Sequence, residues 1–226
     1  MHAIDVITIS REFGAGGGLL ASVLGERLGW RVVDRDLARA VAARLGVPME
    51  AVEARDEHAP GLLERIGTSV LRTSPELVPA PEAVRLPDPA AVAAAVRGVL
   101  LDAAKSPPLV IVGHGSQSLF HGRPGTLHVR LIAPLDARVR RICARSGCTE
   151  KVAAALAQRM DADRASYVRR YFGRDWRDPL LYDVQLNTGS LGLEESAQLI
   201  LAIVAGRRAE PDRAPAAAGA GAERGA

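Results

Sequence analysis

Short apolar runs alternate along the chain with stretches in which apolar residues recur at helical spacing. Residues 4–9 form a β-branched, mostly apolar run, which is typical of a buried parallel strand. Beyond the glycines that follow, leucine and valine recur every three or four residues as far as Leu28, and Gly29 supplies a helix stop signal. Similar apolar runs predict further strands at 31–34, 109–113, 127–133 and 182–187.

Helices are predicted between and after these runs. They cover 36–45, 49–57, 61–71, 90–104, 135–146, 150–171 and 193–204. Five prolines between Thr73 and Pro89 predict a connector without regular structure. The tail, 206–226, has almost no large apolar residue and is predicted to be disordered, because it cannot offset its ordering entropy.

The alternation of strands and helices predicts an α/β fold with a parallel sheet over residues 1–205. Ligands of such sheets bind beyond the carboxyl ends of the strands. A glycine cluster leaves the first predicted strand at that edge. It consists of Gly14, Ala15, Gly16, Gly17 and Gly18.

A strand, a glycine loop and a helix in this order can bind phosphate, because backbone N–H groups converge at the positive end of the helix. The lysine that usually accompanies such a loop is absent. Alignment of G-x-x-x-x-G-K-[ST] on Gly16 puts Arg11 at the first glycine, Gly17 at the lysine and Gly18 at the Ser or Thr. No G-x-G-x-x-G dinucleotide pattern fits. On spacing alone, a phosphate-binding loop and a structural turn are supported about equally.

Composition limits what can replace that lysine. The chain has 226 residues with 48% apolar and 24% charged residues, which fits a globular protein, and its net charge of +3 slightly favours anionic partners. Lys105 and Lys151 are the only lysines among the 29 basic residues, so arginine is the available cation. Without a membrane-length apolar run or a leader pattern, a cytoplasmic protein is expected, and Cys143 and Cys148 fit a reducing compartment without metal-ligand spacing.

Four segments together resemble the cytidylate kinase-like family over roughly 4–204. They read ITISREFGAGGG, VVDRDLARAVAARLGV, RMDADRASYVRRYFGRDWRDPLLYD and LNTGSLGLEESAQLI. The resemblance implies a P-loop kinase fold with about five parallel strands flanked by helices, a helical substrate-binding insertion at about 47–104 and a lid at about 149–178. It also implies transfer of the ATP γ-phosphate to CMP or dCMP with Mg²⁺. The family loop also lacks lysine, but it ends in an arginine where this chain has Gly18, and His114 stands where relatives often carry arginine.

Arginines are the candidates for stabilising the migrating phosphoryl group, because this chemistry needs geometry and positive charge more than covalent help. Arg11 stands at the mouth of the loop. Arg159 and Arg164 bracket Asp161, and the D-x-x-R spacing of Asp161 and Arg164 resembles the lid motif of nucleoside monophosphate kinases. Residues three apart share a helix face, so the aspartate can orient the arginine. The alternative is a solvated helix with ion pairs such as Arg159 with Asp163.

On the acceptor side, Asp34 can accept the exocyclic amine of cytosine, and Arg39 can hold the monophosphate. His114 can donate a weaker hydrogen bond to phosphate. The alternative for Asp34 is a helix cap beside a surface Arg39. Trp176 is expected to anchor a packed turn, and 187–188 lies near the adenine or ribose or forms a turn. No aspartate ends an apolar strand as a clear metal ligand, so Mg²⁺ is expected to be held mainly by phosphates and water.

Two functions of different classes remain open, with ATP and a nucleoside monophosphate as the expected partners. The first is an ATP-dependent nucleoside monophosphate kinase. The second is a catalytically weak nucleotide-binding regulatory protein with the same fold, which the departures at Gly18 and His114 favour. Nucleic-acid binding is disfavoured because the arginines alternate with acidic residues. No membrane partner is expected, and the oligomeric state is left open.

Overall fold

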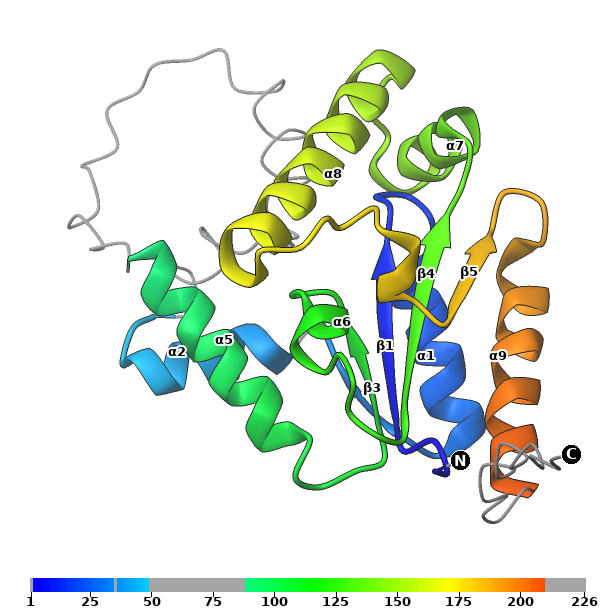
Figure 1. Cartoon of the computed structure of the whole chain (residues 1–226). Helices are drawn as coiled ribbons and strands as arrows, with labels where there is room; N and C mark the ends of the chain where they lie inside the picture. Colours follow the sequence, from blue (N-terminus) through cyan, green and yellow to red (C-terminus); the bar gives the residue numbers. More distant parts are fainter. Residues whose placement is uncertain (1, 35, 49–87, 210–226) are drawn as a thin grey trace, which may run out of the picture.

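A five-stranded parallel sheet forms the centre of the molecule in this computed structural model, which describes residues 2–34, 36–48 and 88–209 (Figure 1). The strands lie in the order β2-β3-β1-β4-β5. They are β1 (Val6–Arg11), β2 (Arg31–Val33), β3 (Leu109–Val112), β4 (Thr126–Ile132) and β5 (Val184–Asn187). The α/β class and the parallel sheet predicted from the apolar runs are confirmed.

The helices also follow the predicted pattern closely. They are α1 (Gly17–Leu28), α2 (Asp36–Leu45), α5 (Pro89–Ala103), α6 (Ser116–Leu119), α7 (Leu135–Ser146), α8 (Glu150–Phe172) and α9 (Gly192–Ala209), with a 3₁₀ turn η1 at Pro179–Leu181. Gly29 ends α1 in the left-handed conformation at φ 67°, as its stop signal indicates. The short α6 and η1 were not predicted, because four and three residues show no helical periodicity. The predictions for 49–57, 61–71, nearly all of the proline-rich connector and the tail beyond 209 lie outside the described residues.

Helices cover both faces of the sheet, so its strands are apolar on both sides. Helices α1 and α9 pack on one face over a core that includes Ile7, Val129 and Leu131 (Figure 1). Helices α2 and α5 pack with Leu109 and Ile111 on the other face. Within the described chain, no helix is long and apolar enough to cross a membrane.

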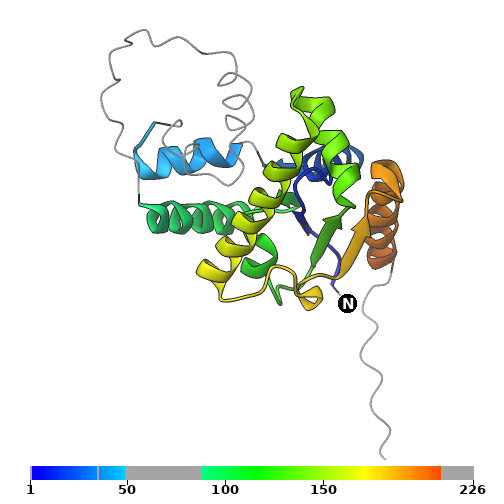
Figure 2. The same ribbon diagram turned by 90° about the horizontal axis from the view of Figure 1, so that it is seen from above.

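Helices α7 and α8 lie beyond the carboxyl ends of the strands (Figures 1 and 2). Their apolar sides pack together through residues such as Ile142 and Met160, and Phe13 of the glycine loop packs against this cluster. The loop therefore lies between the sheet edge and the α7–α8 pair. This contact brings residues more than a hundred positions apart in the sequence to the loop.

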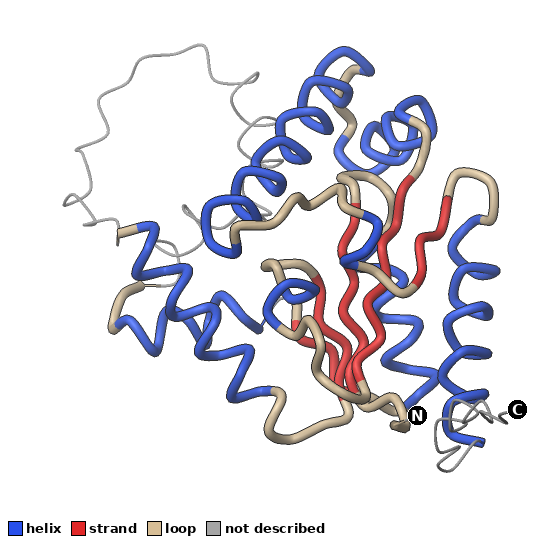
Figure 3. The backbone as a smooth tube through the Cα atoms, in the orientation of Figure 1, coloured by secondary structure: helices blue, strands red, loops and turns tan. Residues whose placement is uncertain are grey.

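A segment with little regular secondary structure covers part of the sheet face on which α2 and α5 pack. The segment 173–183, between α8 and β5, crosses in front of the strands as a loop with one short turn (Figure 3). Beneath it the sheet carries polar side chains instead of the apolar ones seen elsewhere: Thr8 and Ser10 on β1, and His128 and Arg130 on β4, all buried.

Candidate functional site

Two glycines give the loop after β1 its shape. Gly14 and Gly16 have φ angles of 86° and 89°, which side-chain-bearing residues rarely adopt. A Cβ at Gly16 would lie 2.6 Å from a methyl group of Leu193, and one at Gly14 would lie 3.0 Å from the carbonyl oxygen of Arg138. Glycine is therefore required at both positions by backbone conformation and by close packing.

Arg11 explains why position 17 carries no side chain. A Cβ at Gly17 would lie 2.8 Å from Cγ of Arg11, which is closer than real Cβ atoms come to other atoms, and 3.0 Å from Cδ, which is a tight contact. Arg11 is only 7% exposed, so this stem is held in place. The arginine stem thus fills the space where the side chain of a loop lysine would begin.

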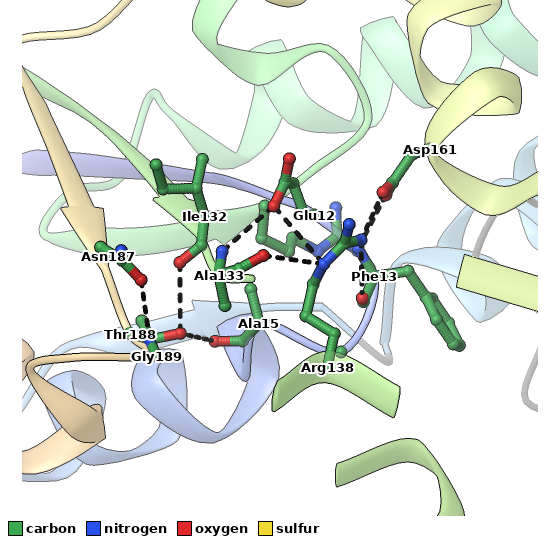
Figure 4. A network of polar contacts seen from close by, with 12 residues as sticks. Glu12, Phe13, Ala15, Ile132, Ala133, Arg138, Asp161, Asn187, Thr188 and Gly189 are labelled. Atoms are coloured by element: carbon green, nitrogen blue, oxygen red, sulfur yellow. Dashed lines mark hydrogen bonds and ion pairs between the residues drawn. The ribbon is translucent and has the colours of Figure 1, made fainter. Parts of the chain in front are cut away.

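The loop carbonyl groups are bonded to the surrounding protein. Arg138 Nη1 donates to the carbonyl of Phe13 (3.3 Å) and Arg141 Nη1 to that of Gly14 (3.4 Å). Thr188, at the end of β5, donates its hydroxyl to the carbonyl of Ala15 (2.9 Å), as Figure 4 shows. Arg141 in turn donates to the hydroxyl and the carbonyl of Thr188, at 3.0 and 2.5 Å.

The loop N–H groups divide into two sets. That of Phe13 donates to Asp161 Oδ1 (2.8 Å), and that of Ala15 donates to the Glu12 carbonyl (3.1 Å). Within the described part of the chain, no hydrogen bond is formed by the N–H groups of the other predicted loop residues, Gly14, Gly16, Gly17 and Gly18. These donors gather at the amino terminus of α1, where the helix dipole favours an anion.

Asp161 is the main link between α8 and the loop. Besides the Phe13 N–H, its carboxylate accepts a charged hydrogen bond from Arg138 Nη1 at 2.6 Å (Figure 4). Arg164 Nη1 is 3.6 Å from the other carboxylate oxygen. The expected orientation of Arg164 by Asp161 is therefore a longer ion pair, and the shorter one goes to Arg138, which the sequence analysis did not single out.

Glu12 completes the attachment of the loop to β4. Its carboxylate accepts the N–H of Ala133 at 3.1 Å and lies 3.6 Å from Arg138 Nε. Arg138 Nε itself donates to the Ala133 carbonyl at 3.0 Å. Two carboxylates thus neutralise the buried Arg138, so this guanidinium acts as a structural clamp for the loop.

The predicted catalytic arginines occupy different environments. Arg164 is 5% exposed, and its Nη1 donates to the Arg11 carbonyl at 3.1 Å. Arg159 lies on another side of α8 with 72% of its side chain exposed, 3.9 Å from Asp163. The structure therefore brings Arg11, Asp161 and Arg164 to the loop, whereas Arg159 forms the solvated ion pair that the alternative interpretation describes.

The acceptor candidates are distributed over three elements. Asp34, after β2, is half-buried, and its Oδ2 lies 3.5 Å from the position of a Cβ at Gly18, which is an ordinary contact distance. His114 is buried at the end of β3 with a φ of 55°, in a turn that packs under Phe172 at the end of α8. Arg39 is exposed on α2. Asp34 is thus the acceptor candidate in contact with the first turn of α1.

Metal-binding groups are sparse. Across the described ranges, no cluster of three or more His, Cys, Asp or Glu side chains could hold a metal ion. Cys143 and Cys148 are free thiols, and burial raises the pKa of Cys143. A divalent cation at the loop would therefore be bound by phosphate and water oxygens in addition to a carboxylate such as Asp34.

Two curated proteins match part of this chain in sequence. Over 96 residues, 42% of the chain, the sequence is 31% identical to a cytidylate kinase from Sulfolobus acidocaldarius, of which the match covers 52%. A second match of 96 residues is 34% identical and covers 41% of this chain and 18% of a uronate isomerase from Corynebacterium glutamicum. The matches thus span about half or less of these curated relatives.

Two solved structures have the same fold. An uncharacterized protein from Eubacterium ventriosum matches with a TM-score of 0.62 at 20% identity, over 89% of this chain and 98% of that one. A shikimate kinase from Acinetobacter baumannii, solved in complex with shikimate, matches with a TM-score of 0.51 at 15% identity, over 92% and 97%. The fold is therefore that of the P-loop kinases. Since the cytidylate kinase-like family matches residues 6–190, the chain belongs to the cytidylate kinase-like family.

Proposed function

We propose that this protein transfers the γ-phosphate of ATP to a nucleoside monophosphate, with CMP or dCMP as the preferred acceptor. One observation carries the first half of the proposal. The N–H groups of Gly14, Gly16, Gly17 and Gly18 have no acceptor within the described chain, while the neighbouring carbonyls are bonded to Arg138, Arg141 and Thr188. A loop with its donors open and its acceptors engaged is suited to a polyphosphate.

Arg11 and Arg164 supply the positive charge in this proposal. The Arg11 stem lies where a loop lysine would start, and Arg164 donates to the Arg11 carbonyl, so both guanidinium groups belong to the loop region. Positive charge there stabilises the charge that develops on the phosphoryl oxygens, which is the main contribution a protein makes to this reaction. Asp161 acts by holding the Phe13 N–H and Arg138, so its role is to position the loop.

Mg²⁺ fits the chemistry of this site. It prefers oxygen ligands and is commonly held by one or two carboxylates together with substrate phosphates and water. The Asp34 carboxylate, next to the first turn of α1, is suited to contribute such an oxygen. When bound with ATP, the ion neutralises phosphate charge, while the loop amides and Arg11 orient the nucleotide.

The choice of acceptor rests on the family and on the cytidylate kinase relative. Asp34, Arg39 and His114 are the proposed acceptor contacts, the insertion is proposed at about 47–104 and the lid at about 149–178. A shikimate kinase with the same fold supports hydroxy acids as competing acceptors. A catalytically weak nucleotide-binding regulator is the second candidate, because Gly18 lacks the family arginine.

A coupled assay with ATP·Mg²⁺ against CMP, dCMP, UMP, AMP, GMP and shikimate tests the proposal. We expect turnover with CMP or dCMP above all others. In the same assay, Arg164→Ala should lower kcat by about a hundredfold, as for the loss of one charge-stabilising donor, while the exposed Arg159→Ala should leave kcat within about twofold. Turnover with shikimate and with none of the nucleoside monophosphates would show that the acceptor is a hydroxy acid and not a nucleoside monophosphate. Saturable ATP binding without turnover of any acceptor would favour the regulatory protein.

A further inference from the structure

A layer of buried polar side chains lies under the segment 173–183. On β1 this layer includes Ser10, one residue before the carboxyl end of the strand. Ser10 on β1 and Arg130 on β4 are paired in register, and their side chains are 2% and 4% exposed. Trp176 Nε1 donates to Ser10 Oγ at 2.8 Å, and Tyr182 Oη lies 3.2 Å from the same oxygen. The covering segment is thus attached to the strand that leads into the glycine loop.

Arg130 is a buried cation of this layer that has no counter-ion among the residues that the structure describes. Its guanidinium stacks 4.5 Å from the ring centre of Trp176 and 5.3 Å from that of Tyr182, and Nη1 donates to the Trp176 carbonyl. Its Nε is buried and has no hydrogen-bond partner. No carboxylate of the described residues forms an ion pair with it, in contrast to Arg138 between Glu12 and Asp161.

An unpaired charge in such a place is costly. Buried ions are normally paired and fully hydrogen-bonded, because these interactions offset the free energy that is lost when the ion leaves water. The Nε–H of arginine and one neighbouring N–H point in the same direction and form a fork that matches the two oxygens of a carboxylate or phosphate. In Arg130 the Nε side of this fork is unused, whereas Nη1 is bonded to protein and the guanidinium lies over the rings of Trp176 and Tyr182.

Further unpartnered polar groups lie on the same face of the sheet. Ser116 and Gln117 of α6 are buried, at 0% and 1% exposure, and Ser116 Oγ and Gln117 Nε2 have no hydrogen-bond partner among the described residues. The end of helix α6 is joined to this face by the ring of His128, whose Nδ1 is 2.7 Å from Thr8 Oγ1 and which is hydrogen-bonded to the backbone of Phe120. Buried groups of this kind are usually satisfied in native proteins, so these atoms are available to a ligand that reaches this face of the sheet.

We infer that Arg130 binds an oxyanion group of the phosphoryl acceptor through its unused Nε edge, with Ser116 and Gln117 bonding the acceptor's other polar atoms. The inference rests on the proposed function and adds a specificity-determining residue that neither the loop nor the sequence motifs contain. The oxyanion is the phosphate of a nucleotide or the carboxylate of a hydroxy acid. Because Trp176 covers the guanidinium, binding shifts the segment 173–183, which also carries Tyr182.

The two tryptophans provide a readout that does not depend on turnover. Trp30 lies in the core on the opposite face of the sheet, and Trp176 stacks on Arg130. In the full chain labelled with 5-fluorotryptophan, ¹⁹F NMR resolves one signal from each, so Trp30 is an internal control. Titration without ATP uses inorganic phosphate, CMP and shikimate in turn. We expect a saturable shift of the Trp176 signal with phosphate and with one of the two organic anions, while Trp30 stays unmoved.

Variants then assign the response. Arg130→Met should abolish the shift, and Arg130→Lys should weaken binding by about tenfold or more, because lysine keeps the charge and loses the fork. Arg31→Met, an exposed arginine on β2, is the matched control and should leave the titration unchanged. Because Arg130→Met removes an unpaired buried charge, the ligand-free variant should melt at the same temperature as the parent or higher.

Several results would overturn the inference. The first is a Trp176 signal that none of the three anions moves. The second is a shift that persists at parental affinity in Arg130→Met or Arg130→Lys. The third is a response to inorganic phosphate but to neither CMP nor shikimate. A lower melting temperature in both variants with unchanged anion affinity would make Arg130 a structural residue only. The proposed function fails separately: it fails if ATP does not bind the loop, whatever the anion titration shows.

Discussion

The stem of Arg11 and the missing side chain of Gly17 occupy the same space, since a Cβ at residue 17 would lie 2.8 Å from Arg11 Cγ. A large side chain at position 11 therefore leaves no room for a side chain at position 17, and the reverse also holds. A lysine at 17 requires a small residue at 11, and the arginine at 11 requires glycine at 17. The Arg11 stem therefore leaves no room for the usual loop lysine at residue 17.

A matched pair of alanine substitutions tests this exclusion. Gly17→Ala should lower the free energy of unfolding by about 1–3 kcal/mol, because the new Cβ meets the buried Arg11 stem. Gly18→Ala, one residue further on, should be neutral or slightly stabilising, because its Cβ lies 3.5 Å from Asp34 Oδ2 and alanine favours a helix. Urea denaturation of both variants gives the comparison. Equal stability of the two would mean that Arg11 moves aside freely.

Asp161 should be a stability residue as well as a site residue. Asp161→Asn leaves the buried Arg138 with a single carboxylate nearby, Glu12 at 3.6 Å, and should cost about 3 kcal/mol of unfolding free energy. The control is Asp163→Asn, because Asp163 makes only an exposed ion pair with Arg159 and should change stability by less than about 0.5 kcal/mol. Chemical denaturation measures both. Similar losses in both variants would contradict a clamp at Asp161.

Thr188 connects β5 to the loop through one hydroxyl. Thr188→Val keeps the shape and leaves the Ala15 carbonyl without this donor, so we expect a loss of about 1–2 kcal/mol in unfolding free energy and weaker ATP binding. Ser190→Ala removes an exposed hydroxyl that bonds the Asn187 carbonyl, and serves as the control. Denaturation and ATP titration are measured on both variants. Unchanged ATP affinity in Thr188→Val would show that the loop holds its shape without β5.

The strands and helices could be predicted from the sequence because local residues determine them. The apolar run 109–113 and the stop at Gly29 carry their information within a few positions. The contacts that hold the loop come from Arg138, Arg141 and Thr188, which lie between 125 and 173 residues away from their loop partners. An arginine-rich segment cannot reveal which arginine reaches the loop, because this depends on how α7 and α8 pack. Arg159 and Arg164 show the difference: the same helix buries one and exposes the other.

His128 should make folding stability depend on pH. Burial lowers the pKa of His128, and Asp183 and the hydrogen bond to the Phe120 backbone only partly oppose this, so the folded state favours the neutral ring. The unfolded chain binds the proton first, at about pH 6.5, so His128 contributes full stability above that pH and loses it as the pH falls toward the lower folded pKa. Denaturation of the parent and of His128→Gln between about pH 8 and pH 5 compares the slopes. The slope should be shallower in His128→Gln, and parallel curves would contradict this role.

Calorimetric titration of ATP into the parent, Arg11→Gly, Gly17→Lys and the double variant tests most directly whether Arg11 provides the loop cation. We expect Arg11→Gly to bind ATP at least about tenfold more weakly than the parent, because a charged hydrogen-bond donor is lost. Gly17→Lys alone should also be impaired, since lysine meets the Arg11 stem. The double variant should regain affinity, because lysine then has the space that arginine left. Parental affinity in Arg11→Gly, or no recovery in a folded double variant, would contradict this role of Arg11.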